Sequence, residues 1–275
     1  MTSTTKMPVA FVPHGGGPWP FVELPGFPRD GFDELLAYLR ALPSLTTTTA
    51  KKKRPRALLV VSAHWEERVP TVMSSARPPM LYDYSGFPPE SYRITWPAPG
   101  DPVLARHVRD LLERAGFSTN EDGARGYDHG TFVPLKVAYP DANVPVVQLS
   151  LVDGLDPAEH IAIGRALAPL RDEGVLIVGS GMTFHNLRAF GDPRAQPIAA
   201  AFDAWLQDAM KRAPSERDAR LVVLESAPHA RLGHPREEHL APLFVVAGAA
   251  GDDVATIPYA ATFMGVALSA FHFGT

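Results

Sequence analysis

Ten histidines are the side chains of this sequence best suited to chemistry, because imidazole both binds metals and transfers protons near neutral pH. They lie at positions 14, 64, 107, 129, 160, 185, 229, 234, 239 and 272. The 275 residues include no cysteine, which excludes disulfides, zinc–thiolate sites and cysteine nucleophiles. Any metal would therefore be held by nitrogen and oxygen ligands.

Three of these histidines come just after predicted strands. Residues 57–61 form an uninterrupted apolar run before Ser62-Ala63-His64, a pattern typical of a strand buried on both faces in a parallel sheet. Shorter apolar runs precede His14 and, through Gly179-Ser180-Gly181, His185. Open α/β sheets bind ligands at the carboxyl edge of their strands. We therefore expect these three histidines to gather at that edge, where they suggest a metal site.

Other chemistries fit these stretches less well. Gly179-Ser180-Gly181 lacks the Gly-x-Ser-x-Gly spacing of a nucleophile elbow, which argues against a serine hydrolase. No Lys-Ser/Thr follows the glycines after His14, which argues against a phosphate-binding loop. A structural role remains an alternative for each histidine, and especially for His129, which is expected in a tight polar loop at residues 126–131. Asp128 in that loop could orient a histidine ring. His107, in the middle of a predicted helix, is expected to be structural, and His160 is expected on the surface.

The elements that must position these side chains alternate between strand and helix. Helical patterns cover residues 32–42, 101–116, 156–172 and 198–210, and closing strands are expected at 255–258 and 265–273. The sequence has no internal repeat and no break in composition. It predicts an α/β fold with a mostly parallel central sheet flanked by helices, in one catalytic domain over residues 1–275. Residues 1–6 are expected to be a flexible tail and 44–56 a surface loop. Glu237 and Glu238 suit the first turn of a helix.

The bulk composition excludes several classes of partner. The net charge is −4, and the short basic run at residues 51–54 is more typical of a solvated loop, so no nucleic-acid partner is expected. Neither a signal core nor a bilayer-spanning apolar stretch is present, which predicts a cytoplasmic protein with no membrane partner. The oligomeric state is left open between a monomer and a homodimer.

Residues 82–100 form a long segment rich in aromatic residues and prolines, without helical or strand periodicity. Such segments are often lids or binding loops. We expect Tyr84, Phe87 and Tyr92 to pack against an aromatic substrate ring. A surface loop held together by its own aromatic residues is an equally good interpretation of this composition.

Six stretches in order resemble one known family over nearly the whole chain. They are His14-Gly15-Gly16-Gly17-Pro18, Ser62-Ala63-His64-Trp65, Tyr82-Asp83-Tyr84-Ser85-Gly86-Phe87-Pro88, Tyr127-Asp128-His129-Gly130-Thr131, Gly179-Ser180-Gly181 with His185-Asn186-Leu187, and His234-Pro235-Arg236-Glu237-Glu238-His239. Together they are similar to the class III extradiol ring-cleavage dioxygenases, in the DOPA 4,5-dioxygenase-like branch.

The resemblance implies roles for five histidines. The metal ligands would be His14, His64 and His239, and His185 would be a catalytic acid/base beside the metal or a fourth ligand of zinc. His129 would be a second catalytic residue, lining the pocket for dioxygen and substrate. More distant members use a glutamate as third ligand, so Glu238 is the alternative to His239.

The implied function is a non-heme extradiol dioxygenase that opens a catechol ring with O₂ to a semialdehyde. Fe(II) is expected for activity, and Zn(II) is a plausible bound metal because imidazole suits both ions. The alternative is a zinc-binding relative without dioxygenase turnover, either hydrolase-like or a binding protein. The partners would be a small catechol and O₂. The identity of the catechol is left open, because no basic residue is placed to pair with a substrate carboxylate.

Overall fold

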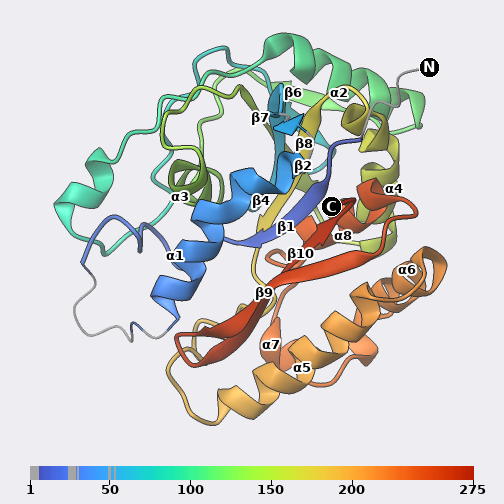
Figure 1. The fold of residues 1–275 in the computed structure, drawn as a ribbon. Coiled ribbons are helices and arrows are strands. Elements are labelled where there is room, and N and C mark those ends of the chain that lie inside the picture. Colours follow the sequence, from blue (N-terminus) through green and yellow to red (C-terminus); the bar gives the residue numbers. More distant parts are fainter. Residues whose placement is uncertain (1–5, 24–28, 30, 49–50, 53) are drawn as a thin grey trace.

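A central sheet of eight strands, in the order β6-β5-β7-β4-β8-β1-β10-β9, organises the chain (Figure 1). The computed structural model describes residues 6–23, 29, 31–48, 51–52 and 54–275. The strands of this sheet are β1 (Val9–Pro13), β4 (Ala57–Glu67), β5 (Thr71–Met73), β6 (Asn120–Asp122), β7 (Val146–Val152), β8 (Val175–Gly181), β9 (Ala255–Phe263) and β10 (Val266–Phe273).

The middle of the sheet is parallel. Strand β4 pairs in parallel with β7 and β8, and β8 pairs in parallel with β1. Antiparallel pairs flank this core, with β5 against β7 on one side and β10 against β1 and β9 on the other. The prediction of a mostly parallel α/β sheet flanked by helices is confirmed. The uninterrupted apolar strands follow from this arrangement, because both faces of the central strands are covered.

Helices cover both faces of the sheet. They are α1 (Phe32–Ala41), α2 (Pro102–Arg114), α3 (His129–Ala138), α4 (Pro157–Leu167), α5 (Ala195–Met210), α6 (Pro214–Val222), α7 (Ala230–Gly233) and α8 (Ala241–Ala250). Alternate residues of β1 belong to two separate buried clusters: Val9 and Phe11 pack with α4 and α8, whereas Ala10 and Val12 pack with α1 and α3. Figure 1 shows α1 and α3 together on one side of the sheet.

Aspartate side chains cap two of these helices. The carboxylate of Asp101 accepts hydrogen bonds from the amides of Val103 and Leu104 at the start of α2, and Asp156 caps α4 in the same way. A side-chain oxygen at this position satisfies amides that the helix leaves unpaired.

Three local expectations were wrong. Residues 44–56 are not simply a loop, since they contain the end of a 3-10 turn, Leu42–Thr46, and the antiparallel pair β2 (Thr47–Thr48) and β3 (Lys51–Lys52). His129 begins helix α3 instead of lying in a loop, because Asp128 caps that helix. Glu237 and Glu238 lie in the turn before α8, not in its first turn.

Two further expectations concern the burial of His160 and the tail at residues 1–6. His160 was expected on the surface, but it is fully buried: its Nδ1 donates to the carbonyl of Asp156, and its Nε2 accepts from the amide of Val152. The expected tail at residues 1–6 lies outside the described residues except for Lys6. Within the described residues, no helix is long and apolar enough to cross a bilayer.

Candidate metal centre

Strand order brings two of the predicted histidines together. Strands β4, β8 and β1 are neighbours, and their register aligns Ser62 with Ser180 and Pro13 with Gly181. His14 directly follows β1. His64 lies within β4, where the register against β7 shifts between Val61 and Glu66. Such an irregularity bends a strand and changes the direction of its side chains. The apolar run of β4 thus ends before His64 although the strand itself continues.

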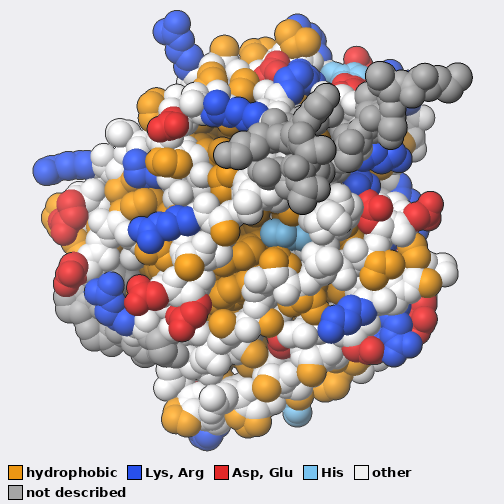
Figure 2. All heavy atoms as spheres, viewed as in Figure 1, with side chains coloured by type: hydrophobic (Ala, Val, Ile, Leu, Met, Phe, Trp, Pro, Cys, Tyr) orange, Lys and Arg blue, Asp and Glu red, His pale blue; other side chains and the backbone are white. Residues whose placement is uncertain are grey.

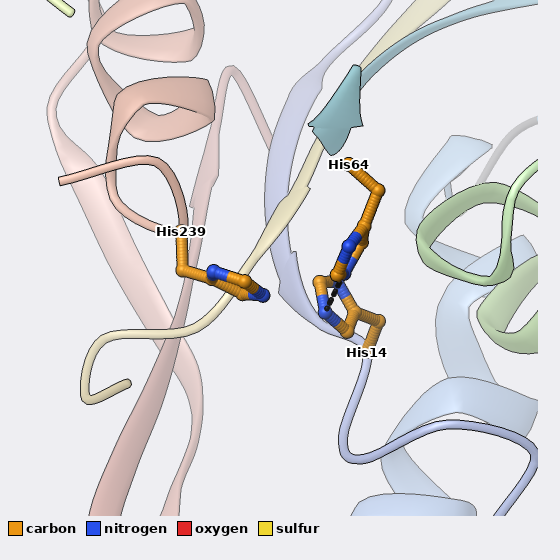
Figure 3. A group of neighbouring side chains, drawn as sticks. All are labelled: His14, His64 and His239. Carbon is orange, nitrogen blue, oxygen red and sulfur yellow. Dashed lines mark hydrogen bonds between the residues drawn. The ribbon is translucent and has the colours of Figure 1, made fainter. Parts of the chain in front are cut away.

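His239 completes a group of three histidines. Its nitrogen ligand atom lies within 4.8 Å of those of His14 and His64, and the three together could hold a metal ion. In Figure 3 the rings of His14 and His64 face one another, and His239 points toward them from the turn before α8. This turn packs directly on the end of β8. A Cβ at Gly181 would lie 2.0 Å from the carbonyl oxygen of His239, so the close approach requires glycine.

Hydrogen bonds fix the Nδ1 atoms of two histidines of this group, His14 and His239. The hydroxyl of Ser180 donates its only proton to the carbonyl of Gly130, so it accepts from Nδ1 of His14 at 3.1 Å. His239 donates from Nδ1 to Glu238 at 3.0 Å. Partners on Nδ1 fix the tautomer whose Nε2 can bind a metal. Nε2 of His14 also lies 3.1 Å from Nε2 of His64. This donor set fits a cation that prefers imidazole.

Burial keeps these three imidazoles neutral. Burial, followed by the neighbouring histidines, lowers the pKa of His14 and of His239 well below the ordinary value. Burial and then the charge of His129 lower the pKa of His64 to about 3, against the opposing effect of Asp83. A metal ligand must be unprotonated. The group therefore remains competent to bind a metal over the physiological pH range.

One carboxylate oxygen links His239 to His185. Oε1 of Glu238 accepts from Nδ1 of His185 at 3.1 Å and from Nδ1 of His239 at 3.0 Å. The two rings stack with centroids 3.3 Å apart. Burial tends to raise the pKa of Glu238, but hydrogen bonding from His185 and nearby positive charge keep it below the ordinary value. Glu238 is thus an ionised acceptor that holds two imidazoles side by side.

A second carboxylate orients His129. Oδ1 of Asp83 accepts from both the amide and Nδ1 of His129, each at 2.9 Å, and Oδ2 lies 3.6 Å from Nδ1 of His64. Asp128 was considered as the residue that orients a ring. It instead accepts hydrogen bonds from Ser62 and Arg125 and caps α3. His129 therefore directs Nε2 away from its carboxylate partner.

A cavity of about 430 Å³ opens over these five histidines. Tyr84 and Phe87 line it, as do Gly15, Gly16 and Gly17. Figure 2 shows a histidine next to hydrophobic side chains near the middle of this face. Tyr92 is not among the lining residues. It is 36% exposed and packs behind Tyr84, with ring centroids 5.5 Å apart.

Comparison with known proteins identifies the family. The model of the catalytic LigB subunit of aromatic ring-opening dioxygenase matches residues 41–268. The chain belongs to this family. It is 45% identical to a 4,5-DOPA dioxygenase extradiol of Beta vulgaris, over 73% of this chain and 75% of that protein. It is 36% identical to a 4,5-DOPA dioxygenase extradiol of Escherichia coli K12, over 96% and 93% of the two chains.

Two further relatives extend the match along the chain. A dioxygenase of Hapsidospora irregularis is 35% identical over 99% of this chain and 88% of its own length. The crystal structure of an uncharacterized protein from Escherichia coli K12 superposes with a TM-score of 0.76 at 32% identity, covering 97% of this chain and 99% of that one. The predicted membership of the class III extradiol dioxygenases is confirmed, and the LigB family and these relatives support an extradiol ring-cleaving dioxygenase activity.

Three polar residues of this LigB-family site were missed or assigned differently from the sequence. Asp83 was noted only as part of an aromatic-rich stretch, Glu238 only as an alternative ligand, and Ser180 only as a rejected nucleophile. All three accept a hydrogen bond from a histidine Nδ1. The available signal was chemical, since five clustered imidazoles need acceptors for the protons on the ring nitrogens that face away from a metal.

Proposed function

We propose that this LigB-family protein opens the aromatic ring of a catechol with O₂, at an iron(II) held by His14, His64 and His239. The observation that carries the proposal is the convergence of these three imidazoles, two of them fixed by hydrogen bonds at Nδ1, at a cavity that His129 and His185 also line. Three protein ligands leave positions for other molecules, whereas a closed tetrahedral set of four would not.

Bound iron would supply a common attachment point for the two catechol oxygens and dioxygen, together with electron transfer between them. The reaction breaks the carbon–carbon bond next to the diol, and both oxygen atoms of O₂ enter the product. One ring carbon becomes a carboxylate and the other an aldehyde, so no further oxidant or reductant is needed.

His185 would act as the catalytic acid/base. Its Nδ1 proton is donated to Glu238, so its Nε2 is free to accept the proton of a catechol hydroxyl. The same atom returns the proton as the O–O bond breaks. Stacking on His239 keeps the ring next to the ligand group, which is consistent with either an acid/base role or a fourth ligand position for zinc.

His129 would be a second catalytic residue at the cavity. Asp83 fixes its Nδ1 proton, so Nε2 is available to a substrate hydroxyl or to dioxygen. Tyr84 and Phe87 would cover the aromatic ring of the substrate and exclude water from it. Exclusion of water strengthens electrostatic interactions inside the site.

Anaerobic reconstitution with Fe(II), followed by oxygen uptake with a panel of catechols, tests the function. The expected result is consumption of one O₂ per catechol and a yellow ring-opened product. A protein that binds Zn(II) tightly but consumes no oxygen with any catechol after Fe(II) loading would contradict the proposal and favour a zinc-binding relative without dioxygenase turnover.

Metal content of single variants tests the ligands. We expect His14→Ala, His64→Ala and His239→Ala each to lose most of the bound metal. Glu238→Ala is the decisive comparison, because its carboxylate binds Nδ1 of His239 and does not belong to the group formed by the three histidines. Full occupancy in His239→Ala with loss in Glu238→Ala would make Glu238 the third ligand instead.

A further inference from the structure

We infer that the substrate is an uncharged catechol carrying an apolar substituent, rather than a catechol with a carboxylate or an amino-acid side chain. This inference rests on the proposed function and extends it to the class of substrate. It comes from the chemical composition of the cavity wall and from the charges that lie just behind it.

The cavity wall beyond the histidines is apolar. Its side chains include Trp19, Phe32, Met182, Phe190, Phe263 and Met264. Among the described residues that line it, none is lysine, arginine, aspartate or glutamate, and none has an aliphatic hydroxyl or amide side chain. Trp19 also directs its indole N–H away, to the carbonyl of His14. A substituent that leaves the histidines therefore meets hydrocarbon, aromatic rings and thioether sulfur.

Charges immediately behind the wall would repel a substrate carboxylate. Asp83 and Glu238 are the carboxylates that orient the site histidines, and both face the cluster. Two arginines of this region already have carboxylate partners. Arg125 binds Asp128, and Arg236 binds Glu66 with both of its terminal nitrogens and lies 3.8 Å from Glu238. An anionic substituent on the apolar wall would meet no lysine or arginine among the described residues that line the cavity.

Burial of an unpaired charge is costly, whereas burial of an alkyl or aryl group is favourable. Loss of hydration without a compensating partner disfavours an ionised carboxylate or ammonium, and removal of each methylene group from water favours binding. The cavity of about 430 Å³ is within the size range of small-molecule pockets. It can therefore accommodate a catechol ring together with such a substituent.

The loop after β8 and the turn between β9 and β10 form the wall that the substituent would contact. Leu187 and Phe190 come from the loop, and Met264 from the turn, and the amide of Gly191 donates to the carbonyl of Met264 at 3.0 Å. Leu187 is 74% exposed, so this wall reaches the solvent. The apolar lining thus continues from the histidines to the mouth.

A pair of related substrates provides the test: 3-(3,4-dihydroxyphenyl)propanoate is an anion, whereas its methyl ester is uncharged and larger by one methyl group. With the Fe(II)-loaded protein, we expect kcat/KM for the ester to exceed that for the acid by on the order of 100-fold. Equal values, or a preference for the acid or for DOPA, would overturn the inference while leaving the proposed ring cleavage intact.

Anaerobic calorimetry with the same pair separates this inference from the proposed function. If neither compound is cleaved, the proposed ring cleavage is wrong. The inference about the cavity still predicts that the protein binds the ester more tightly than the acid. We expect this preference in the metal-free protein as well, because it comes from the wall. Similar affinities in the metal-free protein would overturn the inference whatever the turnover shows.

Two variants locate the source of the preference. Leu187→Arg places a cation at the mouth and should raise kcat/KM for the acid relative to the ester by about tenfold, the effect of one favourable ion pair in a partly buried setting. Val103→Arg makes the same change at another exposed apolar residue, on α2 outside the cavity lining, and should leave the ratio unchanged. An equal change in both would show a general charge effect and contradict the role of the wall.

Arg29 lies near the cavity, so its role as a possible partner of a substrate carboxylate has to be tested. Its guanidinium carbon lies 5.9 Å from the ring centroid of Phe32, which lines the cavity. Arg29→Ala should not reduce the turnover of either compound selectively. If the acid is cleaved well by the parent protein and poorly by Arg29→Ala, then Arg29 binds the carboxylate and the inference is wrong.

Discussion

Asp83 holds His129 at two points, accepting hydrogen bonds of 2.9 Å from both the backbone amide and Nδ1 of that residue. The contact joins the aromatic-rich segment to the first turn of α3, and the other carboxylate oxygen lies 3.6 Å from Nδ1 of His64. One side chain of the aromatic-rich segment therefore orients His129 and also places a carboxylate beside His64. This arrangement couples the order of the segment to the proton positions in the site.

Asp83→Asn should lower kcat by about 10- to 100-fold, the usual effect of losing a carboxylate partner of a functional histidine. The amide oxygen of asparagine can still accept a hydrogen bond from Nδ1. It lacks the negative charge with which the carboxylate favours the tautomer protonated at Nδ1. Steady-state kinetics with a catechol would measure the change. Glu90→Gln, an exposed change on the same segment, is the control and should behave like the parent protein. An unchanged kcat in Asp83→Asn would show that the pair does not orient His129 for turnover.

His185→Ala should lower kcat by about 10²- to 10⁴-fold, the range of a lost general acid/base, while metal content stays near that of the parent protein. The two measurements have to be made on the same preparation. His107→Ala removes an exposed histidine that pairs with Glu173 at the surface and should change neither quantity. Loss of metal in proportion to loss of rate would instead make His185 a ligand.

Glu238→Gln should weaken metal binding by about 10- to 100-fold as well as slow turnover, because the carboxylate increases the basicity of His239 and fixes its tautomer. Competition with a chelator under equilibrium conditions measures the affinity directly. Glu237→Gln is the matched control, since that neighbouring carboxylate pairs with Arg231. Equal metal affinity in Glu238→Gln and the parent protein would contradict the orienting role.

Phe87→Ala should raise KM for a catechol by about 3- to 10-fold, with a smaller change in kcat, because a lost aromatic contact is worth about 0.5–1.5 kcal/mol. Phe87 lines the cavity and lies over Gly17, where an added Cβ would be 2.5 Å from its ring. Tyr92→Ala should have a weaker effect, because Tyr92 lies behind Tyr84. Identical KM values for the parent protein, Phe87→Ala and Tyr92→Ala would show that this segment does not contact the substrate.

The sequence predicts the sheet and the meeting of His14 and His64 because both depend on local patterns. Apolar runs identify buried strands, and histidines at their ends have to meet if the strands are neighbours. The carboxylate partners have no such local signature: Asp83 is 46 residues from His129, and Glu238 is 53 residues from His185. Their contacts appear only once the loops are packed.

Errors in the local predictions share a physical cause. His160 follows a cap and a proline, which suggested an exposed first turn, but that turn packs against the end of β7 and its ring bonds to Val152. His129 follows a Gly-Tyr-Asp stretch that suggested a loop, but the aspartate caps α3. In both regions tertiary packing decided between interpretations that were locally equivalent.

His272 provides a test of stability far from the histidine cluster. It lies on β10, and its Nε2 is 2.8 Å from the hydroxyl of Tyr38. Burial lowers the pKa of His272 to about 4, and burial also keeps Tyr38 neutral by raising its pKa. The unfolded chain therefore binds a proton at this site more readily than the folded protein does. Its contribution to stability is complete above about pH 6.5 and is lost as the pH falls toward 4.

His272→Gln removes this titration and keeps a polar partner for Tyr38. Between pH 7 and pH 4 the parent protein should lose on the order of 3 kcal/mol of unfolding free energy relative to the variant. Urea denaturation at a series of pH values measures the difference, and the other buried histidines cancel in the comparison. His229→Asn, an exposed change that suits the left-handed backbone at that residue, where φ is 59°, should follow the parent protein. A constant difference between His272→Gln and the parent over this range would show that His272 is not held neutral by burial.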